Sequence, residues 1–305
     1  MDTVLTLVKQ TVTMFLLAGV GFAMFKSGKI TKEGSKSIGN ILIYGSLPCV
    51  LISSFFIEKT QEHMIGLAIS AALGFLLVLM SILVGKLCFR EDAIAKFAAA
   101  FSNPGFFGIP LILASLGSGC VFYVAGFIAC VNLGQWTYGV AVMTGQKGGF
   151  SLKRLVTAPF AIAIAIGLAI FLTGIEIPGI LKNSITAIKE LNTPLAMFTV
   201  GIYLAQTDLK NMFFKKSLYS ISLVRLLVIP ALAILLLWPL PAAMLDMKIA
   251  LFIAAACPVG SNIAVYAQLH NQDYAYSVET VIISTILAIV TMPIMVSLAQ
   301  MVWAL

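Results

Sequence analysis

Long apolar stretches alternate with short polar segments along the whole chain, and this pattern predicts membrane-spanning helices. A helix needs about 20 predominantly apolar residues to cross the hydrocarbon core of a bilayer. Stretches close to that length recur from end to end, so we expect an all-α polytopic membrane protein with ten transmembrane helices. Their approximate bounds are residues 3–25, 38–57, 64–88, 97–117, 119–143, 157–175, 180–206, 217–240, 247–269 and 275–303.

Two of these expected helices contain residues that should break them. The stretch "FSNPGFFGIPLI" (residues 101–112) holds two prolines and two glycines, and "CPVGSN" (residues 257–262) holds Pro258 and Gly260. Each proline removes a backbone N–H and clashes with the preceding turn, and lipid offers no water to the carbonyls that are set free. Irregular backbone at membrane depth is tolerated where it is buried in protein or lines a wet cavity. We therefore interpret both segments as broken helices at a binding site.

Milder proline breaks occur in two further helices, at Pro48 in "GSLPCV" and at Pro194 in "NTPLAM". Pro48 and Pro194, like Pro104 and Pro258, are separated by close to half of the chain. Each half then contains five helices, and because five is odd, the second half enters the membrane from the opposite side. This predicts an inverted repeat, a construction found in many secondary transporters. The two repeats are expected at residues 1–150 and 151–305.

Composition and charge agree with a membrane protein. Of the 305 residues, 60% are hydrophobic and 10% are charged, and the mean hydropathy is +1.04, whereas soluble proteins usually carry about a quarter charged residues. The net charge of +7 does not indicate nucleic-acid binding, because the basic residues sit in short clusters between apolar runs, as in cytoplasmic loops. The clusters after the odd-numbered helices predict a cell-membrane protein with both termini outside; they comprise Lys26, Lys29, Lys32, Lys36, Lys86, Arg90, Lys96, Lys147, Lys153, Arg154, Lys210, Lys215 and Lys216.

Motifs typical of enzymes and metal sites are missing from the sequence. It holds no HExxH or GxSxG motif, its histidines His63 and His270 flank apolar runs, and none of its five cysteines belongs to a CxxC pair. An intramembrane enzyme would need a nucleophile or metal constellation at depth. We therefore expect no enzyme, no metal and no cofactor.

The broken helices supply the candidate binding residues. The half-helix after each break begins with free backbone N–H groups and the positive end of its dipole, which suits a carboxylate. Glycines let a ligand or another helix approach closely, and asparagines donate and accept hydrogen bonds without adding charge. The competing interpretation is that the proline kinks and glycine faces serve only helix packing. The candidates are Asn103, Gly105, Gly108, Ser261 and Asn262, together with Ser46 and Thr193 at the milder breaks.

The pattern Asn–x–Gly–x–x–Gly–x–Pro, formed by Asn103, Gly105, Gly108 and Pro110, resembles the auxin efflux carrier family, the bacterial relatives of the plant PIN transporters. The stretch "CPVGSN" is similar to the family's second broken helix, and "STILAIVTMP" to its last helix. The resemblance covers nearly the whole chain. Pro104 departs from the small residue expected after the asparagine.

The resemblance implies ten helices divided into a scaffold and a transport domain. It also implies that helices 4 and 9 cross at their breaks near the membrane midplane, that the substrate lies beside the crossing on Asn103 and Asn262, and that helix 5 faces it. Bacterial members are usually assigned to small carboxylates such as malate or malonate, and plant members export the auxin anion. We therefore expect a secondary transporter that moves a small organic anion by alternating access. The residues implied at the crossing are Pro104, Pro110 and Pro258, and those on helix 5 are Asn132, Gln135 and Tyr138.

Few ionisable residues fall within the expected helices. Arg225 lies about 13 Å along a helix from Lys216, where it would pair with a substrate carboxylate, snorkel to the interface or form a structural ion pair. Glu279 is expected near the outer surface, as an interfacial group or a proton-coupling group. No deep pair of carboxylates exists for relaying protons, which favours uncoupled or weakly coupled transport.

Several alternatives stay open. Lys182, Lys189 and Glu190 would also fit an interfacial segment ahead of the seventh span. Sodium- or proton-coupled uptake, as in bile-acid carriers, is the second transporter interpretation, and a non-transporting receptor or channel belongs to another class. The sequence does not identify the substrate, the direction of transport, the coupling ion or the oligomeric state, for which a homodimer is one option.

We predict that Asn103→Ala and Asn262→Ala each abolish substrate binding and leave folding intact, because both side chains orient the anion without supporting the core. Thermal-shift titration of the purified variants with carboxylates measures both properties. Wild-type affinity in both variants would contradict the assignment of the site.

Overall fold

The structure is a computed structural model that describes residues 2–145 and 156–303. Over these ranges the regular elements are helices, and the extended pairing is limited to one isolated antiparallel bridge. Six helical segments are long and apolar enough to cross a membrane, judged by length and composition. The chain is therefore a multi-pass membrane protein. These segments are Leu5–Lys26, Lys32–Ser54, Gln61–Cys88, Gly119–Thr144, Lys216–Leu237 and Tyr274–Trp303.

Three of the expected helices form without interruption: α1 (Asp2–Lys26), α4 (Gln61–Cys88) and α18 (Tyr274–Trp303). The last of these stays helical through Pro293. Large apolar side chains lie on their outer faces, as at Leu16, which is 69% exposed. Apolar surface of this kind is a liability in water, but it suits contact with lipid.

Three further spans each contain a π turn, which inserts one extra residue into the helix. The first joins α2 (Lys32–Ile41) to α3 (Leu47–Ser54) through η1 (Leu42–Ser46). The second joins α7 (Gly119–Gly134) to α8 (Val140–Thr144) through η3 (Gln135–Gly139), and the third joins α14 (Lys216–Leu223) to α15 (Ile229–Leu237) through η4 (Val224–Val228).

The other spans are built from shorter pieces. In one, α5 (Ala93–Ala100) is separated from the π turn η2 (Pro104–Gly108) and α6 (Ile109–Leu116). In another, η5 (Ala242–Met244) and α16 (Leu245–Ala256) are separated from α17 (Asn262–Leu269). The helix expected over residues 180–206 is divided at residues 190 and 191. The pieces there are α11 (Gly179–Lys189) and α12 (Asn192–Gln206), and the short α13 (Leu209–Met212) follows them. The helix expected over residues 157–175 forms as one uninterrupted but shorter helix, α10 (Pro159–Thr173).

Prolines account for three of the four π turns in the described ranges. Pro48, Pro110 and Pro230 each follow a π turn by two residues. A proline ring clashes with the carbonyl four residues earlier, and in all three cases that carbonyl belongs to the third residue of the π turn. The wider turn provides room for the ring, so these spans bend around their prolines without ending.

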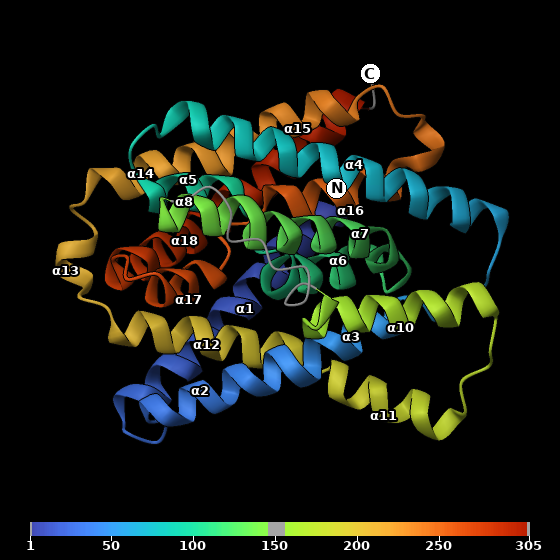
Figure 1. Ribbon diagram of the computed structural model, residues 1–305, viewed down its shortest axis with the longest axis horizontal. Coiled ribbons are helices and arrows are strands. Elements are labelled where there is room, and N and C mark those ends of the chain that lie inside the picture. Colours follow the sequence, from blue (N-terminus) through green and yellow to red (C-terminus); the bar gives the residue numbers. More distant parts are fainter. Residues whose placement is uncertain (1, 146–155, 304–305) are drawn as a thin grey trace.

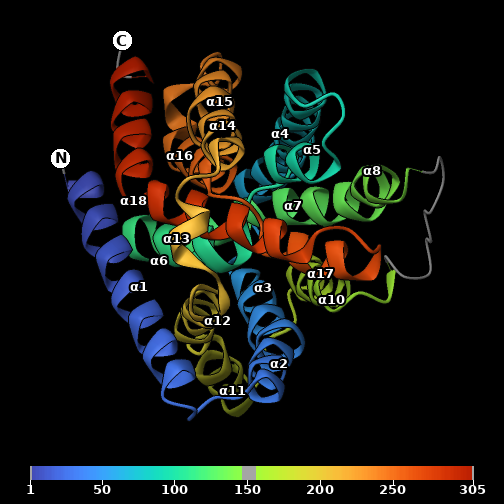
Figure 2. The ribbon, with the colours of Figure 1, turned by 90° about the vertical axis from the view of Figure 1, so that its left-hand side faces the viewer.

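The helices form two groups, which Figures 1 and 2 show from two directions. In the lower part, α1 packs against α12, and α3 packs against α10 and α11. In the upper part, α4 packs against α5, and α15 packs against α16. The pieces α6, α7 and α17 lie between the two groups. The broken helices are thus placed where the two groups meet.

Glycines allow a very close crossing of α1 and α12. A Cβ atom built on Gly21 would lie 2.6 Å from the Phe198 Cα atom, and one built on Gly201 would strike the Ala18 carbonyl oxygen. The two backbones therefore touch directly, as in membrane helix pairs that use small residues at their interface.

We predict that Gly201→Ala lowers the free energy of unfolding by about 1–3 kcal/mol, the usual range for overpacking. The added methyl group meets backbone, which cannot rotate away. The apparent melting temperature of the purified protein in detergent measures the effect. Gly19→Ala, on α1, is the matched control, because a Cβ atom there meets nothing within 4 Å. Equal melting of the two variants would contradict the close crossing.

Candidate functional site

The breaks of the two interrupted helices lie side by side and pair through their backbones. Ser102 and Val259 form the antiparallel bridge. The Asn103 N–H donates to the Pro258 carbonyl at 2.9 Å, and the Gly260 N–H donates to the Phe101 carbonyl at 2.9 Å. Each break thereby satisfies polar backbone groups of the other, which lipid cannot do.

Two glycines permit this approach. A Cβ atom on Gly260 would lie 2.8 Å from the Ser102 carbonyl oxygen, and one on Gly108 would lie 2.9 Å from the Cys257 Sγ. A third element fixes the pair, because the Ser284 Oγ on α18 accepts a hydrogen bond from the Val259 N–H at 3.1 Å. The crossing is therefore tightly packed on several sides.

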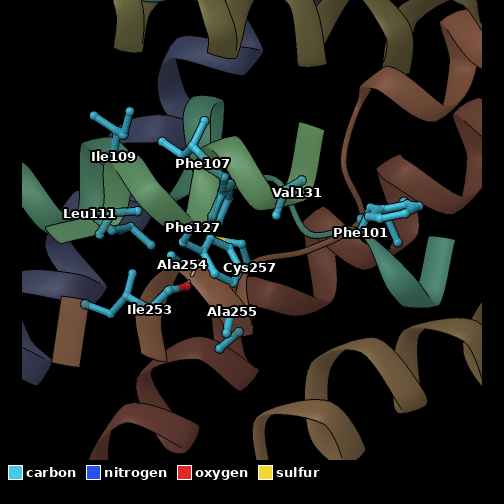
Figure 3. Packing of buried hydrophobic residues seen from close by; sticks show 14 of the residues in the cluster. Phe101, Phe107, Ile109, Leu111, Phe127, Val131, Ile253, Ala254, Ala255 and Cys257 are labelled. Atoms are coloured by element: carbon cyan, nitrogen blue, oxygen red, sulfur yellow. Dashed lines mark hydrogen bonds between the residues drawn. The ribbon is translucent and has the colours of Figure 1, made fainter. Parts of the chain in front are cut away.

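A buried apolar cluster surrounds the crossing, as Figure 3 shows. Phe107 comes from η2, Phe127 and Val131 come from α7, and Ile253 comes from α16. All four side chains are at most 3% exposed. The paired breaks are thus held inside protein, away from the lipid-facing surface.

After each break a half-helix begins with its N–H groups free. The Asn103 Oδ1 caps one of these groups by accepting from the Phe106 N–H at 3.2 Å. The N–H groups of Gly105, Ser261 and Asn262 make no hydrogen bond to the part of the chain that the structure describes. Asn103 therefore also supports the fold, and its replacement by alanine should cost about 1 kcal/mol through the lost cap.

A small cavity adjoins these half-helix starts. Its volume, counted as the space open to the centres of water-sized spheres, is about 40 Å³. No acidic or basic side chain is among the described residues that line it, which makes it a neutral cavity with many hydrogen-bond donors. Its lining residues are Leu47, Ser102, Asn103, Pro104, Gly105, Phe106, Ile128, Val131, Asn132, Gln135, Gly260, Ser261 and Asn262.

Polar side chains in the lining leave donors unused. The Asn262 Nδ2 donates to the Gln135 Oε1 at 3.1 Å, which links α17 to η3. The Ser102 Oγ is buried without a hydrogen-bond partner in the described ranges. For the Asn103 Nδ2, too, the described residues provide no acceptor. A ligand with acceptor oxygens would satisfy these groups.

The structure brings most of the sequence candidates to this cavity and leaves others outside it. Asn103, Gly105, Asn132, Gln135, Ser261, Asn262 and Pro104 are among the lining residues, whereas Ser46, Thr193, Gly108, Tyr138, Pro110 and Pro258 are not. The Ser46 Oγ instead donates to the Lys189 carbonyl at 3.5 Å. The Tyr138 hydroxyl is buried without a partner in the described part of the chain.

Residues that the sequence analysis missed also belong to the site. Ser102 precedes Asn103, and Leu47 precedes Pro48. Their closeness to a break was therefore the only feature of the sequence that could have identified them as site residues. Asn192, directly before Thr193, is buried and donates from its Nδ2 to the Gly105 carbonyl at 3.2 Å. It ties α12, from the lower group of helices, to the π turn at the crossing.

Arg225 is placed differently from all three sequence expectations. It does not snorkel, because it is 1% exposed. It lies outside the cavity lining, and the described residues give it no carboxylate partner. Its Nη1 donates to the Ala99 carbonyl at 2.9 Å, and its Nη2 donates to the Ala255 carbonyl. The guanidinium therefore bridges the C-terminal ends of α5 and α16.

Glu279 is buried and paired, whereas the sequence analysis expected an interfacial or proton-coupling group near the outer surface. Its carboxylate forms an ion pair with Lys215, at 2.6 Å between Oε2 and Nζ, and its side chain is 6% exposed. Lys215 belongs to the basic loop before α14, which the charge pattern assigns to the cytoplasm. Because the ion pair places the start of α18 beside that loop, a cytoplasmic loop and an outer position for Glu279 cannot both hold.

Comparison with known proteins agrees with this architecture. The sequence model of a family described as "Membrane transport protein" matches residues 6–153 and 143–296. A protein of Rhizobium meliloti (strain 1021) named "Putative malonate transporter" is 23% identical to this chain over 300 residues, which cover 90% of each protein. The chain therefore belongs to this membrane transport family, the auxin efflux carriers that its broken helices resemble.

Proposed function

We propose that the protein is a secondary transporter that moves a small organic carboxylate across the cell membrane, with the substrate held in the cavity at the paired breaks. One observation carries the proposal. Two half-helix starts and several uncharged side-chain donors converge on a cavity whose described lining contains no acidic group. Free N–H groups and positive dipole ends favour an anion, and the unused donors favour carboxylate oxygens.

The size of the cavity supports a small carboxylate over an auxin-like acid. The cavity leaves about 40 Å³ for the centres of water-sized spheres, which is room for a few water molecules. A three-carbon dicarboxylate such as malonate therefore needs far less widening of the cavity than an acid that carries an indole ring. The name of the Rhizobium meliloti relative points to the same class of substrate.

The helix contacts support ten spans arranged as an inverted repeat. Counted in spans, α1 with α12 pairs the first and the seventh, and α10 with α3 pairs the sixth and the second. Exchanging the two halves of the chain turns the first contact into the second, as expected for a repeat. The linkers before α2, α5 and α14 lie at the left of Figure 1, and those before α4, α11 and α16 lie at the right. With the basic loops in the cytoplasm, both termini are outside.

Alternating access follows from this arrangement. The lower group of helices acts as a scaffold, and the upper group carries the crossing past it, so that the cavity opens to each side in turn. The Asn192 bond to the Gly105 carbonyl is then one of the contacts that the motion must break.

The membrane potential supplies a driving force. Since moving one elementary charge across the membrane is worth about 2.3 kcal/mol per 100 mV, a cell that is negative inside expels the anion without a coupling ion.

We predict that Asn103→Asp abolishes malonate binding and leaves the melting temperature of the ligand-free protein close to that of the wild type. The aspartate keeps the oxygen that caps η2, but it replaces a donor by a negative charge that repels the anion. Thermal-shift titration measures the affinity, because a ligand of the folded state raises stability by RT ln(1 + [L]/Kd).

Asn183→Asp is the matched control, since it makes the same change at an exposed position of α11. It should bind malonate like the wild type. Saturable malonate counterflow in proteoliposomes tests transport itself. Saturable binding without counterflow would indicate a receptor, and flux that does not saturate would indicate a channel; either result would overturn the proposed mechanism.

A further inference from the structure

Arg225 lies where the negative ends of both broken helices converge. The last four carbonyls of a helix have no partner within it, and Ala99 and Ala255 are the penultimate residues of α5 and α16. The guanidinium donates to both of their carbonyls. A single side chain on η4 thus reaches the same position in each of the two broken helices.

The charges in this arrangement balance. Each helix C-terminus carries about −0.5 elementary charge, so the two ends together offset the +1 of one guanidinium. An unpaired charge that is fully removed from water is very costly, and Arg225 is 1% exposed. The described part of the chain contains one ion pair, Lys215–Glu279, which does not involve it. The two carbonyl ends are therefore its counter-charge.

We propose that Arg225 is the resident cation of the crossing, held at the half-helix carbonyl ends where broken-helix transporters coordinate a coupling Na⁺ or H⁺. The inference rests on the proposed function, because it concerns the coupling of the transport proposed above. Arg225 acts as a positioning residue: it holds α5 and α16 together beyond the breaks and touches no substrate. Because Arg225 neutralises the negative ends of α5 and α16, these ends do not weaken the attraction between the positive half-helix starts and the substrate anion. For the same reason, the transporter needs no sodium ion at this position.

The first test uses the wild-type protein. Its melting temperature without carboxylate, and its malonate affinity, should be the same in sodium chloride as in choline chloride of equal concentration. A sodium-dependent rise in either quantity would show that a separate cation is required, and would overturn the inference.

The second test removes the guanidinium from the carbonyl ends of α5 and α16. Arg225→Ala should melt several degrees below the wild type, and millimolar guanidinium should restore part of that loss, because the free ion can occupy the vacated position. The same guanidinium concentration should not raise the melting temperature of the wild type or of Arg90→Ala, a control at an exposed arginine. An arginine that stabilises the fold only by packing its alkyl chain would show no such rescue. The absence of rescue from a folded Arg225→Ala protein would therefore contradict the inference.

Arg225→Lys keeps the test decisive if the alanine variant does not fold. A lysine ammonium is a compact charge without the two-pronged fork of arginine, so it can neutralise the carbonyl ends but holds them together less well. We expect this variant to fold, to remain insensitive to sodium and to bind malonate about tenfold more weakly. Wild-type affinity and melting would show that the bridge is unnecessary, and new sodium dependence would show that the charge is not retained in place.

These readouts separate the two proposals. Melting in sodium, choline and guanidinium salts is measured without any carboxylate, so it tests Arg225 even if malonate does not bind. Conversely, if the wild type does not bind malonate, the proposed substrate is wrong, but the guanidinium rescue of Arg225→Ala is unaffected.

Discussion

Backbone polar groups at membrane depth need protein partners, and this constraint shapes the centre of the molecule. Prolines and glycines interrupt two helices where lipid cannot satisfy the exposed N–H and carbonyl groups. The two interruptions solve this problem for each other, through the paired hydrogen bonds around Ser102 and Val259. Because the pairing requires close contact, it also dictates the glycines on either side and the buried cluster around them.

The same pairing separates charge across the crossing. In each broken helix, the first half ends at the break with its negative carbonyl end, and the second half begins there with its positive N–H end. The two positive ends lie on one side of the crossing, and the two negative ends lie on the other. The positive starts adjoin the neutral cavity, and the negative ends adjoin Arg225. The proposed anion-binding site and the buried Arg225 thus have a common origin in the breaks, and neither needs an acidic side chain in the lining.

The position of this centre between two groups of helices is what supports the proposed transport motion. The α1 and α12 crossing is packed backbone to backbone through Gly21 and Gly201, which suits a rigid scaffold. That group also packs against the first broken helix, α1 against α6 and α12 against η2. The Asn192 bond to the Gly105 carbonyl is among these contacts. Hydrogen bonds of this kind contribute about 1 kcal/mol each, so they can be broken during a transport cycle.

The sequence by itself determined the class of the protein, the approximate position of its helices and the residues of its breaks. Apolar length predicts spans, and proline with glycine predicts interruption, because both signals are local. For the same reason Asn103, Gly105, Ser261 and Asn262 were identified before their contacts were known. The division between α11 and α12 was one of the alternatives left open by Lys182, Lys189 and Glu190. The π turns were not foreseen, since they depend on how each helix packs.

Only the tertiary structure decided which residues meet. Arg225 could not be assigned to the ends of α5 and α16 from its place in the chain, because Ala99 and Ala255 are distant in sequence and have no side-chain signal. Asn192 and Ser102 acquired roles for the same reason, through contacts with segments far along the chain. A pattern of residue types reports what a segment can offer, whereas packing in three dimensions fixes which partner accepts it.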